Sequence, residues 1–490
     1  MDYFLHACLA NRKDKNCKLS RKIEDDTMET IVNANGTVRN IIGQQSLKDV
    51  DYRLLKYILE VDVEEGLLLD NVITGQITLL KEDERSILHQ LPRKPNDKMK
   101  QLISDYYLVP VDFNEYEFVR GYRSVLQQVE RNKEKPITKY ILFPTTCCNA
   151  RCFYCFESGL NKINMDETTA IKVAQFIRDN VKGKQAEISW FGGEPTVGMK
   201  CIDYICYLLK EYGVDYTSGM VSNGYLFSED IVAKAVKEWN LKSIQITLDG
   251  TEEIYNKTKN YIVPGNAYKR VMNNIGLLLE AGVEVTILLN LDYHNCDDLF
   301  ELIDELAVRF KQYKNFRVSS HVLFNDEGFE KVHHTAQQEE ELANHNYKLA
   351  CHMTNVGLNG RVLGDVRFKK SLPMVRYAYC MVKDSGAIVI APNGNLFKCE
   401  HIEDNLASTA SVEGGGFRKA ELDEWFVGDE EEKCSECPLY PDCFVPRKCK
   451  DHAKCFPVDV ESKVKGYKDN ISKMYQDLLK KSAEKAEEDK

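Results

Sequence analysis

The sequence lacks any hydrophobic segment long enough to cross a membrane. No apolar run reaches the roughly 18–20 residues that a membrane-spanning helix requires. The first residues, MDYFLHACLANRKDKNCK, hold a short apolar stretch followed by charges, which is not the pattern of a secretory signal peptide. We therefore expect a cytoplasmic protein with no membrane partner.

Positive charge is also scarce. The chain of 490 residues has 65 Lys and Arg against 76 Asp and Glu, which gives a net charge of -11. Nucleic acid binds to basic surfaces, so this balance argues against a nucleic-acid partner. The hydrophobic share of 43% is ordinary for a globular protein, and the length suits two or three domains.

Cysteine, in contrast, is abundant and clustered. Of the 17 cysteines, four lie from Cys147 to Cys155 and five from Cys434 to Cys455. In a reducing cytosol, clustered cysteines more often bind metal or perform redox chemistry than form disulfides. The two clusters are therefore the first candidates for functional sites.

Residues 1–118 are expected to form an N-terminal module. Turn signals at Asp70-Asn71 and Thr74-Gly75 separate short predicted strands, and two amphipathic helices follow them. Strands followed by helices predict a small α+β, winged-helix-like module, and a plain structural cap is the alternative. The predicted strands cover residues 57–62 and 66–80, and the helices cover 84–91 and 97–109.

Residues 138–325 follow a linker at 119–137 and alternate regularly between strand and helix. This alternation implies a parallel sheet, and six units predict an α/β fold with a partial (β/α)6 barrel. Active sites of parallel barrels lie at the C-terminal ends of the strands. Strands are predicted at 138–144, 186–192, 219–224, 243–250, 283–292 and 316–324, and helices at 165–182, 199–212, 228–239, 265–281 and 297–312.

Three further parts follow the predicted barrel. Residues 326–372 form a charged, partly helical connecting segment. Residues 373–457 are cysteine-rich with few periodic runs, which predicts an irregular domain. Residues 458–490 predict a surface helix that ends in a run of charges.

The first cysteine cluster has the spacing of an iron–sulfur site with an open position. Cys148, Cys152 and Cys155 form a C-x3-C-x2-C motif directly after the first predicted barrel strand. Three thiolates can hold three irons of a [4Fe–4S] cube, and the fourth iron is then free to bind a small molecule. A zinc site is the alternative, although structural zinc usually takes four N or S ligands.

This motif resembles that of the radical SAM superfamily, in which the open iron is chelated by the amino and carboxylate groups of S-adenosylmethionine (SAM). Tyr154, the aromatic residue before the last cysteine, also fits the family. Gly192-Gly193-Glu194, after the second strand, resembles the family motif that holds the methionine amine of SAM, since glycines admit close backbone approach.

Polar residues at the later strand ends extend this resemblance. In the family, matching positions contact SAM, and turn or cap chemistry is the alternative. Leu288 is a departure, because relatives often have an arginine two residues before the last of these positions. The positions are Ser222, Asn223, Asp249 and Asn290.

The C-terminal cysteines resemble the SPASM extension of radical SAM enzymes, which carries two auxiliary [4Fe–4S] clusters. Gly394-x4-Cys399 and the following C-x2-C-x5-C motif carry the likeness, although the family usually has x3 in place of x5. Two cubes take eight thiolates, and this region offers seven. The first cluster then has an open iron or takes Cys351 or Cys147, and a zinc ribbon is the alternative. The resemblance assigns Cys380, Cys399 and Cys449 to the first cluster and Cys434, Cys437, Cys443 and Cys455 to the second.

The resemblance implies an enzyme that cleaves SAM reductively to a 5′-deoxyadenosyl radical, which abstracts hydrogen from an unactivated carbon. Cys148, Cys152 and Cys155 are then its catalytic residues, and a flavodoxin or ferredoxin is the external electron donor. SPASM relatives act on peptides or proteins. We therefore expect a maturase of ribosomal precursor peptides that joins a cysteine sulfur to a carbon as a thioether.

The N-terminal module suits this function, because its order of strands and helices resembles the leader-peptide recognition element of such maturases, which pairs a leader with a strand edge. An anaerobic sulfatase-maturating, formylglycine-generating enzyme is the first alternative. Those relatives typically lack the N-terminal hundred residues and have an Asp where this chain has Glu400. A peptide epimerase, a carbon–carbon crosslinking maturase and a zinc-binding scaffold are the others.

Overall fold

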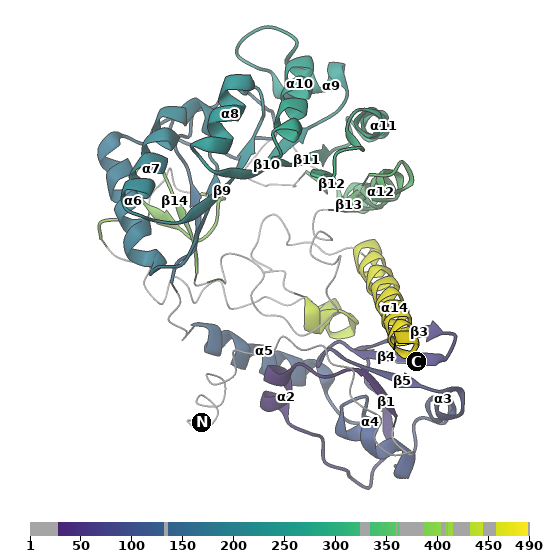
Figure 1. Ribbon diagram of the computed structural model, residues 1–490. Coiled ribbons are helices and arrows are strands. Elements are labelled where there is room, and N and C mark those ends of the chain that lie inside the picture. The colour runs from purple at the N-terminus through teal and green to yellow at the C-terminus, as the bar shows by residue number, and fades with distance from the viewer. Residues whose placement is uncertain are drawn as a thin grey trace.

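The structure is a computed structural model of the 490-residue chain. The larger of its two bodies holds the parallel sheet, the smaller holds the N-terminal strands, and helix α14 (Pro457–Glu488) contacts both (Figure 1). No helix among the described residues has the length and apolar character of a membrane span. The described residues are 28–131, 136–323, 334–358, 360–362, 384, 386–402, 408, 410–414, 432–443 and 457–488.

A sheet of nine described strands forms the larger body, in the order β13-β12-β11-β10-β9-β8-β7-β14-β15. Every neighbouring pair from β13 to β14 is parallel, and β15 is antiparallel to β14. The predicted α/β fold with a partial barrel is confirmed. The strands are β7 Lys139–Leu142, β8 Ala186–Trp190, β9 Tyr216–Ser222, β10 Leu241–Leu248, β11 Glu284–Leu291, β12 Phe316–Val322, β13 Gly360–Val362, β14 Ala387–Ile390 and β15 Leu396–Phe397.

The parallel part of the sheet has two more strands than predicted. The strands β13 and β14 lie in the predicted connecting segment and the predicted irregular domain, and they add one strand at each side of the six predicted strands. The strand β13 has three residues and β14 has four, which is too short for a clear sequence pattern. Residues far downstream thus return to pair with β7, the strand before the first cysteine cluster.

Helices connect the parallel strands and cover the outer face of the sheet (Figure 1). Capping side chains fix where they begin: Asp166 accepts from the Thr169 N–H at the start of α6, and Asn266 from the Lys269 N–H at the start of α10. The helix α9 was not predicted, because its sequence EEIYNKTK is mostly polar. The helices are α6 Glu167–Val181, α7 Met199–Glu211, α8 Glu229–Lys237, α9 Glu252–Lys259, α10 Ala267–Glu280, α11 Asp298–Phe310 and α12 Ala336–Asn355.

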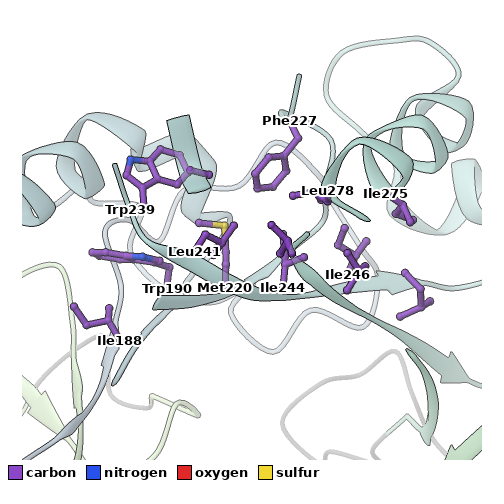
Figure 2. Close-up of a cluster of buried hydrophobic side chains, with 14 of the residues drawn as sticks. Ile188, Trp190, Met220, Phe227, Trp239, Leu241, Ile244, Ile246, Ile275 and Leu278 are labelled. Carbon is purple, nitrogen blue, oxygen red and sulfur yellow. The ribbon is translucent and has the colours of Figure 1, made fainter. Parts of the chain in front are cut away.

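The apolar side chains between the sheet and these helices form the main core. Figure 2 shows Trp190 and Met220 from the strands facing Trp239 and Phe227 from the connecting segments. Both tryptophans are fully buried. This packing fixes the strand ends from which the site is built.

The N-terminal module is a small α+β unit with a four-stranded antiparallel sheet in the order β1-β5-β4-β3. The predicted turn at Asp70-Asn71 is wrong, because these residues end β4. The turn covers residues 72–75, and Asn71 Oδ1 accepts hydrogen bonds from the N–H groups of Ile73 and Thr74 within it. The elements are β1 Glu29–Val32, α2 Gly36–Ile42, β2 Tyr52–Leu54, β3 Ile58–Val63, β4 Gly66–Asn71, β5 Gln76–Leu80, α3 Glu82–His89, α4 Lys100–Ser104, β6 Leu108–Pro110 and α5 Glu115–Arg131.

A second hydrophobic core joins this module to the C-terminal region. Leu439 and Tyr440, from the cysteine-rich segment, pack in it together with Tyr467 and Ile471 of α14. The predicted module boundary at residue 118 lies inside α5. The N-terminal sheet and the segment 432–443 therefore share one packed interior.

Candidate active site

The loop between β7 and α6 carries the first cysteine cluster. Cys148, Cys152 and Cys155 are half-buried on it, at the C-terminal edge of the parallel sheet. Burial raises the pKa of Cys148 to about 12 and that of Cys155 to about 11. Buried thiols of this kind are protonated at neutral pH without a metal, and iron would bind them as thiolates with release of protons.

The turn at Gly192-Gly193, after β8, packs directly on the backbone that precedes Cys148. The Gly193 N–H donates to the Thr145 carbonyl over 3.2 Å, and the Glu194 N–H donates to the Cys147 carbonyl over 2.9 Å. Gly192 has a φ of 115°, and a side chain on either glycine would collide with the backbone of the cysteine loop. The glycines are therefore required here by close approach of two backbone segments.

Glu194 is 1% exposed, and its carboxylate is bonded inside the protein. Its Oε1 accepts from the Ser222 hydroxyl over 2.8 Å and from the Thr196 N–H over 3.0 Å. Its Oε2 accepts from the Asn223 N–H over 2.7 Å. Burial raises the pKa of Glu194 against the lowering effect of these bonds. The side chain thus ties the end of β8 to the end of β9, and Ser222 and Asn223 serve as its partners.

Asn149 is a site residue that the sequence reasoning missed. The Asn223 Nδ2 donates to Asn149 Oδ1 over 2.7 Å, whereas Asn149 Nδ2 is a buried donor without a partner in the described part of the chain. A buried donor needs an acceptor, and the carboxylate or ribose oxygens of SAM have that chemistry. The available signal was its position between the first two cysteines of the motif.

Asp249, at the end of β10, is held by two neighbours. The Tyr154 hydroxyl lies 2.8 Å from both carboxylate oxygens, and Lys259 Nζ lies 3.1 Å from Oδ2. Lys259 was missed because it ends α9, the helix that was not predicted. The predicted contact of Asp249 with SAM therefore stays a prediction, while its contacts with Tyr154 and Lys259 are part of the structure.

Asn290 completes the row of strand ends. It is 7% exposed, and its carbonyl accepts from Asn295 Nδ2, which also donates to the Asp249 carbonyl. The C-terminal ends of β7 to β11 thus bring the predicted site residues to one edge of the sheet. That edge carries Cys148, Gly192, Ser222, Asp249 and Asn290.

Glu157 is a second residue that was missed. It is buried, and both carboxylate oxygens lack a hydrogen-bond partner in the described part of the chain. Burial raises its pKa to about 7, while Lys162 and His401 act to lower that pKa. The His401 ring stacks on Phe156 at 4.4 Å, so the segment after Cys399 lies against the cysteine loop.

The auxiliary-cluster cysteines are described in part. Cys399 follows β15 and is half-buried, and Cys351 is exposed on α12. Among the described residues, no three His, Cys, Asp or Glu side chains converge at the spacing of a single metal ion. Cys434, Cys437 and Cys443 lie on or beside two short 3-10 helices, Glu432–Glu436 and Tyr440–Asp442, whereas Cys380, Cys449 and Cys455 lie outside the described residues.

The N-terminal module contacts this second cysteine motif directly. Arg123 donates to the carbonyls of Tyr440 (3.2 Å) and Cys443 (2.6 Å), and Lys56 Nζ donates to the Ser435 carbonyl over 2.5 Å. These bonds hold the backbone on both sides of Cys437. The auxiliary clusters themselves stay a prediction.

Comparison with known proteins identifies the domain that carries the site. Residues 142–306 match the family model of the Radical SAM superfamily. The cysteine-type anaerobic sulfatase-maturating enzyme of Clostridium novyi is 27% identical over 197 residues, which are 36% of this chain and 51% of that protein. A probable GTP 3′,8-cyclase of Methanococcus maripaludis is 24% identical over 149 residues, 30% of this chain and 48% of that one. The chain thus spans about half the length of these curated relatives.

A solved structure shows the same fold. Native anSMEcpe with bound AdoMet aligns at a TM-score of 0.51 with 14% sequence identity, over 69% of this chain and 99% of that one. The residues that match the family model include the cysteine loop and the strands β8 to β11. Residues 142–306 are therefore a radical SAM domain, the domain of enzymes that use a [4Fe–4S] cluster and SAM.

Proposed function

We propose that the chain is a radical SAM peptide maturase that forms a thioether between a cysteine sulfur and a carbon of a ribosomal precursor peptide. The observation that carries the proposal is the edge of the sheet where the cysteine loop, the Gly193 turn and the Glu194 network meet. A peptide substrate is supported by native anSMEcpe, which has been solved with bound AdoMet and the Cp18Cys peptide and aligns with this chain at a TM-score of 0.50.

The residues of this chain have separate tasks in that reaction. Cys148, Cys152 and Cys155 would hold the cluster, which together with SAM supplies a radical that takes a hydrogen atom from the substrate. The Glu194 network holds the Gly193 turn against the cysteine loop, and Asn149 offers a buried donor to an acceptor oxygen.

The C-terminal cysteines would hold the acceptor of the remaining electron. Thioether formation removes two hydrogens from the peptide, one as an atom and one as the thiol proton, and releases one electron. Auxiliary clusters at Cys399 and at the motif Cys434 to Cys443 would supply an acceptor for it. A flavodoxin or ferredoxin would return electrons to the first cluster.

The N-terminal module is the proposed site for the leader of the precursor peptide. Of its described sheet, β1 and β3 are the edges, and β3 contacts α14. An extended peptide binds to a sheet by adding a strand at an open edge. We therefore assign the leader to the β1 edge.

Sulfatase maturation is the second candidate, and the identity with the Clostridium novyi enzyme favours it. Two features of the sequence argue against sulfatase maturation. Glu400 stands where those relatives have an Asp, and residues 1–118 are expected to form an N-terminal module of the length that those relatives typically lack. The N-terminal module has its own sheet and shares a core with the cysteine-rich segment. A structural role of this extent favours the peptide maturase.

Anaerobic reconstitution tests the proposal. Three clusters predict about twelve irons per chain, and a variant with Ala at Cys148, Cys152 and Cys155 should lose about four of them and all formation of 5′-deoxyadenosine. A cysteine-containing precursor peptide encoded near the gene should lose two hydrogens and one alkylatable thiol. An aldehyde on a sulfatase peptide would instead establish the second candidate, and zinc without iron would refute both.

A further inference from the structure

We propose that Lys259 is a positioning residue for the cluster: the end of α9 clamps the cysteine loop, and the buried Lys259–Asp249 pair sets the reduction potential of the cluster bound there. The proposal depends on the radical SAM domain and not on which substrate the enzyme modifies. The structure supports it by backbone contacts, by side-chain contacts and by the position of the ion pair beside Cys152.

The backbone contacts come from the point where α9 ends. Asn260 has a φ of 45°, which ends the helix and turns the chain back. The Lys259 carbonyl accepts from the Arg151 N–H over 2.9 Å, and three residues later the Ile262 N–H donates to the Asn149 carbonyl, also over 2.9 Å. Both bonds hold the three residues that separate Cys148 from Cys152. The loop conformation that places these two thiols is therefore fixed by α9.

The side chain of Lys259 turns inward from the same point. It is 4% exposed, its Nζ lies 3.1 Å from Asp249 Oδ2, and it donates to the Tyr154 hydroxyl over 2.8 Å. The ammonium also lies 5.4 Å from the centre of the Tyr154 ring. Tyr154 in turn donates to Asp249, so the aromatic residue of the cysteine motif is bound by both members of the pair.

This arrangement places the ion pair beside Cys152. The Cys152 Sγ lies 3.9 Å from the Lys259 carbonyl. Both members of the pair contact the hydroxyl of Tyr154, which lies two residues after Cys152 in the cysteine loop. A thiolate bound to iron senses the same two charges, and a nearby cation favours the reduced, more negative state of a cluster.

The alternative is that the buried pair acts only by filling space, since apolar residues of similar volume can often replace a buried ion pair without loss of stability. Charge and structure make different predictions for the two single variants. Lys259→Met leaves the Asp249 carboxylate near Cys152, whereas Asp249→Asn leaves the Lys259 ammonium there. If the pair acts by charge, the reduction potential moves in opposite directions in the two variants. If it acts by packing alone, both variants disturb the loop in the same way.

The experiment is a redox titration of the reconstituted full chain, followed by electron paramagnetic resonance. The signal that changes when SAM is added belongs to the cluster with the open iron, which separates it from any other cluster. We expect a more negative midpoint potential in Lys259→Met, a more positive one in Asp249→Asn, and a value between them in the double variant. Lys234→Met is the matched control, because Lys234 forms its ion pair with Asp203 on the outer helices and should leave the potential unchanged.

Iron content keeps the test decisive if a variant loses its cluster. Loss of about four irons in Lys259→Met, with retention in Lys259→Arg, supports the positioning role, and Asp249→Asn then tests the charge. Shifts of both single variants in the same direction, or no shift with full iron, would overturn the proposal. The titration needs no peptide, so failure of the proposed peptide chemistry would leave its result intact.

Discussion

The substitution Gly193→Ala tests whether the active site depends on contact between two backbone segments. An added Cβ would lie 2.6 Å from the Thr146 carbonyl oxygen and 2.7 Å from the Cys147 carbonyl carbon. Heavy atoms pack at about 3.5–4.0 Å, so the turn and the cysteine loop must separate by roughly 1 Å. Overpacking of this kind costs about 1–3 kcal/mol. The two backbone bonds from Gly193 and Glu194 would weaken as well, at about 1 kcal/mol each.

We therefore expect Gly193→Ala to lower the free energy of unfolding by about 2–4 kcal/mol. Since misplacement by about 1 Å can reduce a rate about 100-fold, formation of 5′-deoxyadenosine should fall by that order. Gly276→Ala is the control, because nothing lies within 4 Å of a Cβ at this position in α10 and alanine favours a helix. The assays are chemical denaturation, iron content and 5′-deoxyadenosine formation with excess reductant. Cleavage at the wild-type rate with full iron would refute the reasoning.

Three further predictions concern the rest of the chain. Arg123→Ala removes bonds to the backbone at Cys443, so iron content should fall by about four per chain while SAM cleavage persists, and Arg120→Ala on the exposed side of α5 should retain all iron. Burial and a nearby carboxylate raise the pKa of Asp70 in the folded protein. Above about pH 4 the unfolded chain ionises Asp70 more readily than the folded one, so the free energy of unfolding falls as pH rises. The gain in Tm from Asp70→Asn should therefore grow from about pH 4 to about pH 8. Cys351→Ser should leave iron content unchanged. Cys351 is exposed on α12, which packs on β12 and β13, whereas Cys399 follows β15 at the opposite end of the sheet.

Local pattern explains which elements of the fold could be predicted. The central strands are buried runs rich in Ile, Val and Leu, and such runs are visible in the sequence alone. The helix α9 is mostly polar because it buries little beyond Tyr255 and Lys259, so it has no clear apolar stripe. The turn predicted at Asp70-Asn71 begins two residues later in the structure, because Asn71 ends the strand while its side chain caps the turn.

The chemistry of the site was harder to predict than its location. The sequence predicts that the cysteine motif, the glycines and the polar strand ends share one edge of the sheet, and the structure places them there. The role of the Glu194 carboxylate depends on Ser222 and Asn223, which are 28 and 29 residues away in the chain. Lys259 lies 107 residues from Cys152. Such contacts follow from the packing of strands and not from local spacing, so the sequence pointed to the residues but not to their partners.

Each of the two hydrophobic cores supports a different cysteine motif, and the second core combines segments from both ends of the chain. The core under the parallel sheet supports the cysteine loop and the strand ends. The other core joins the N-terminal sheet, Cys434 and Tyr440, and α14. A ligand affects a distant site only if it binds two conformations of the protein with different affinity, and the packed residues that differ between these conformations carry the effect. A leader bound at β1 would thus act first on the core that holds the second cysteine motif. We expect substitutions in this core to reduce iron at the C-terminal cysteines before they reduce SAM cleavage, and the reverse order would show that the barrel carries the coupling.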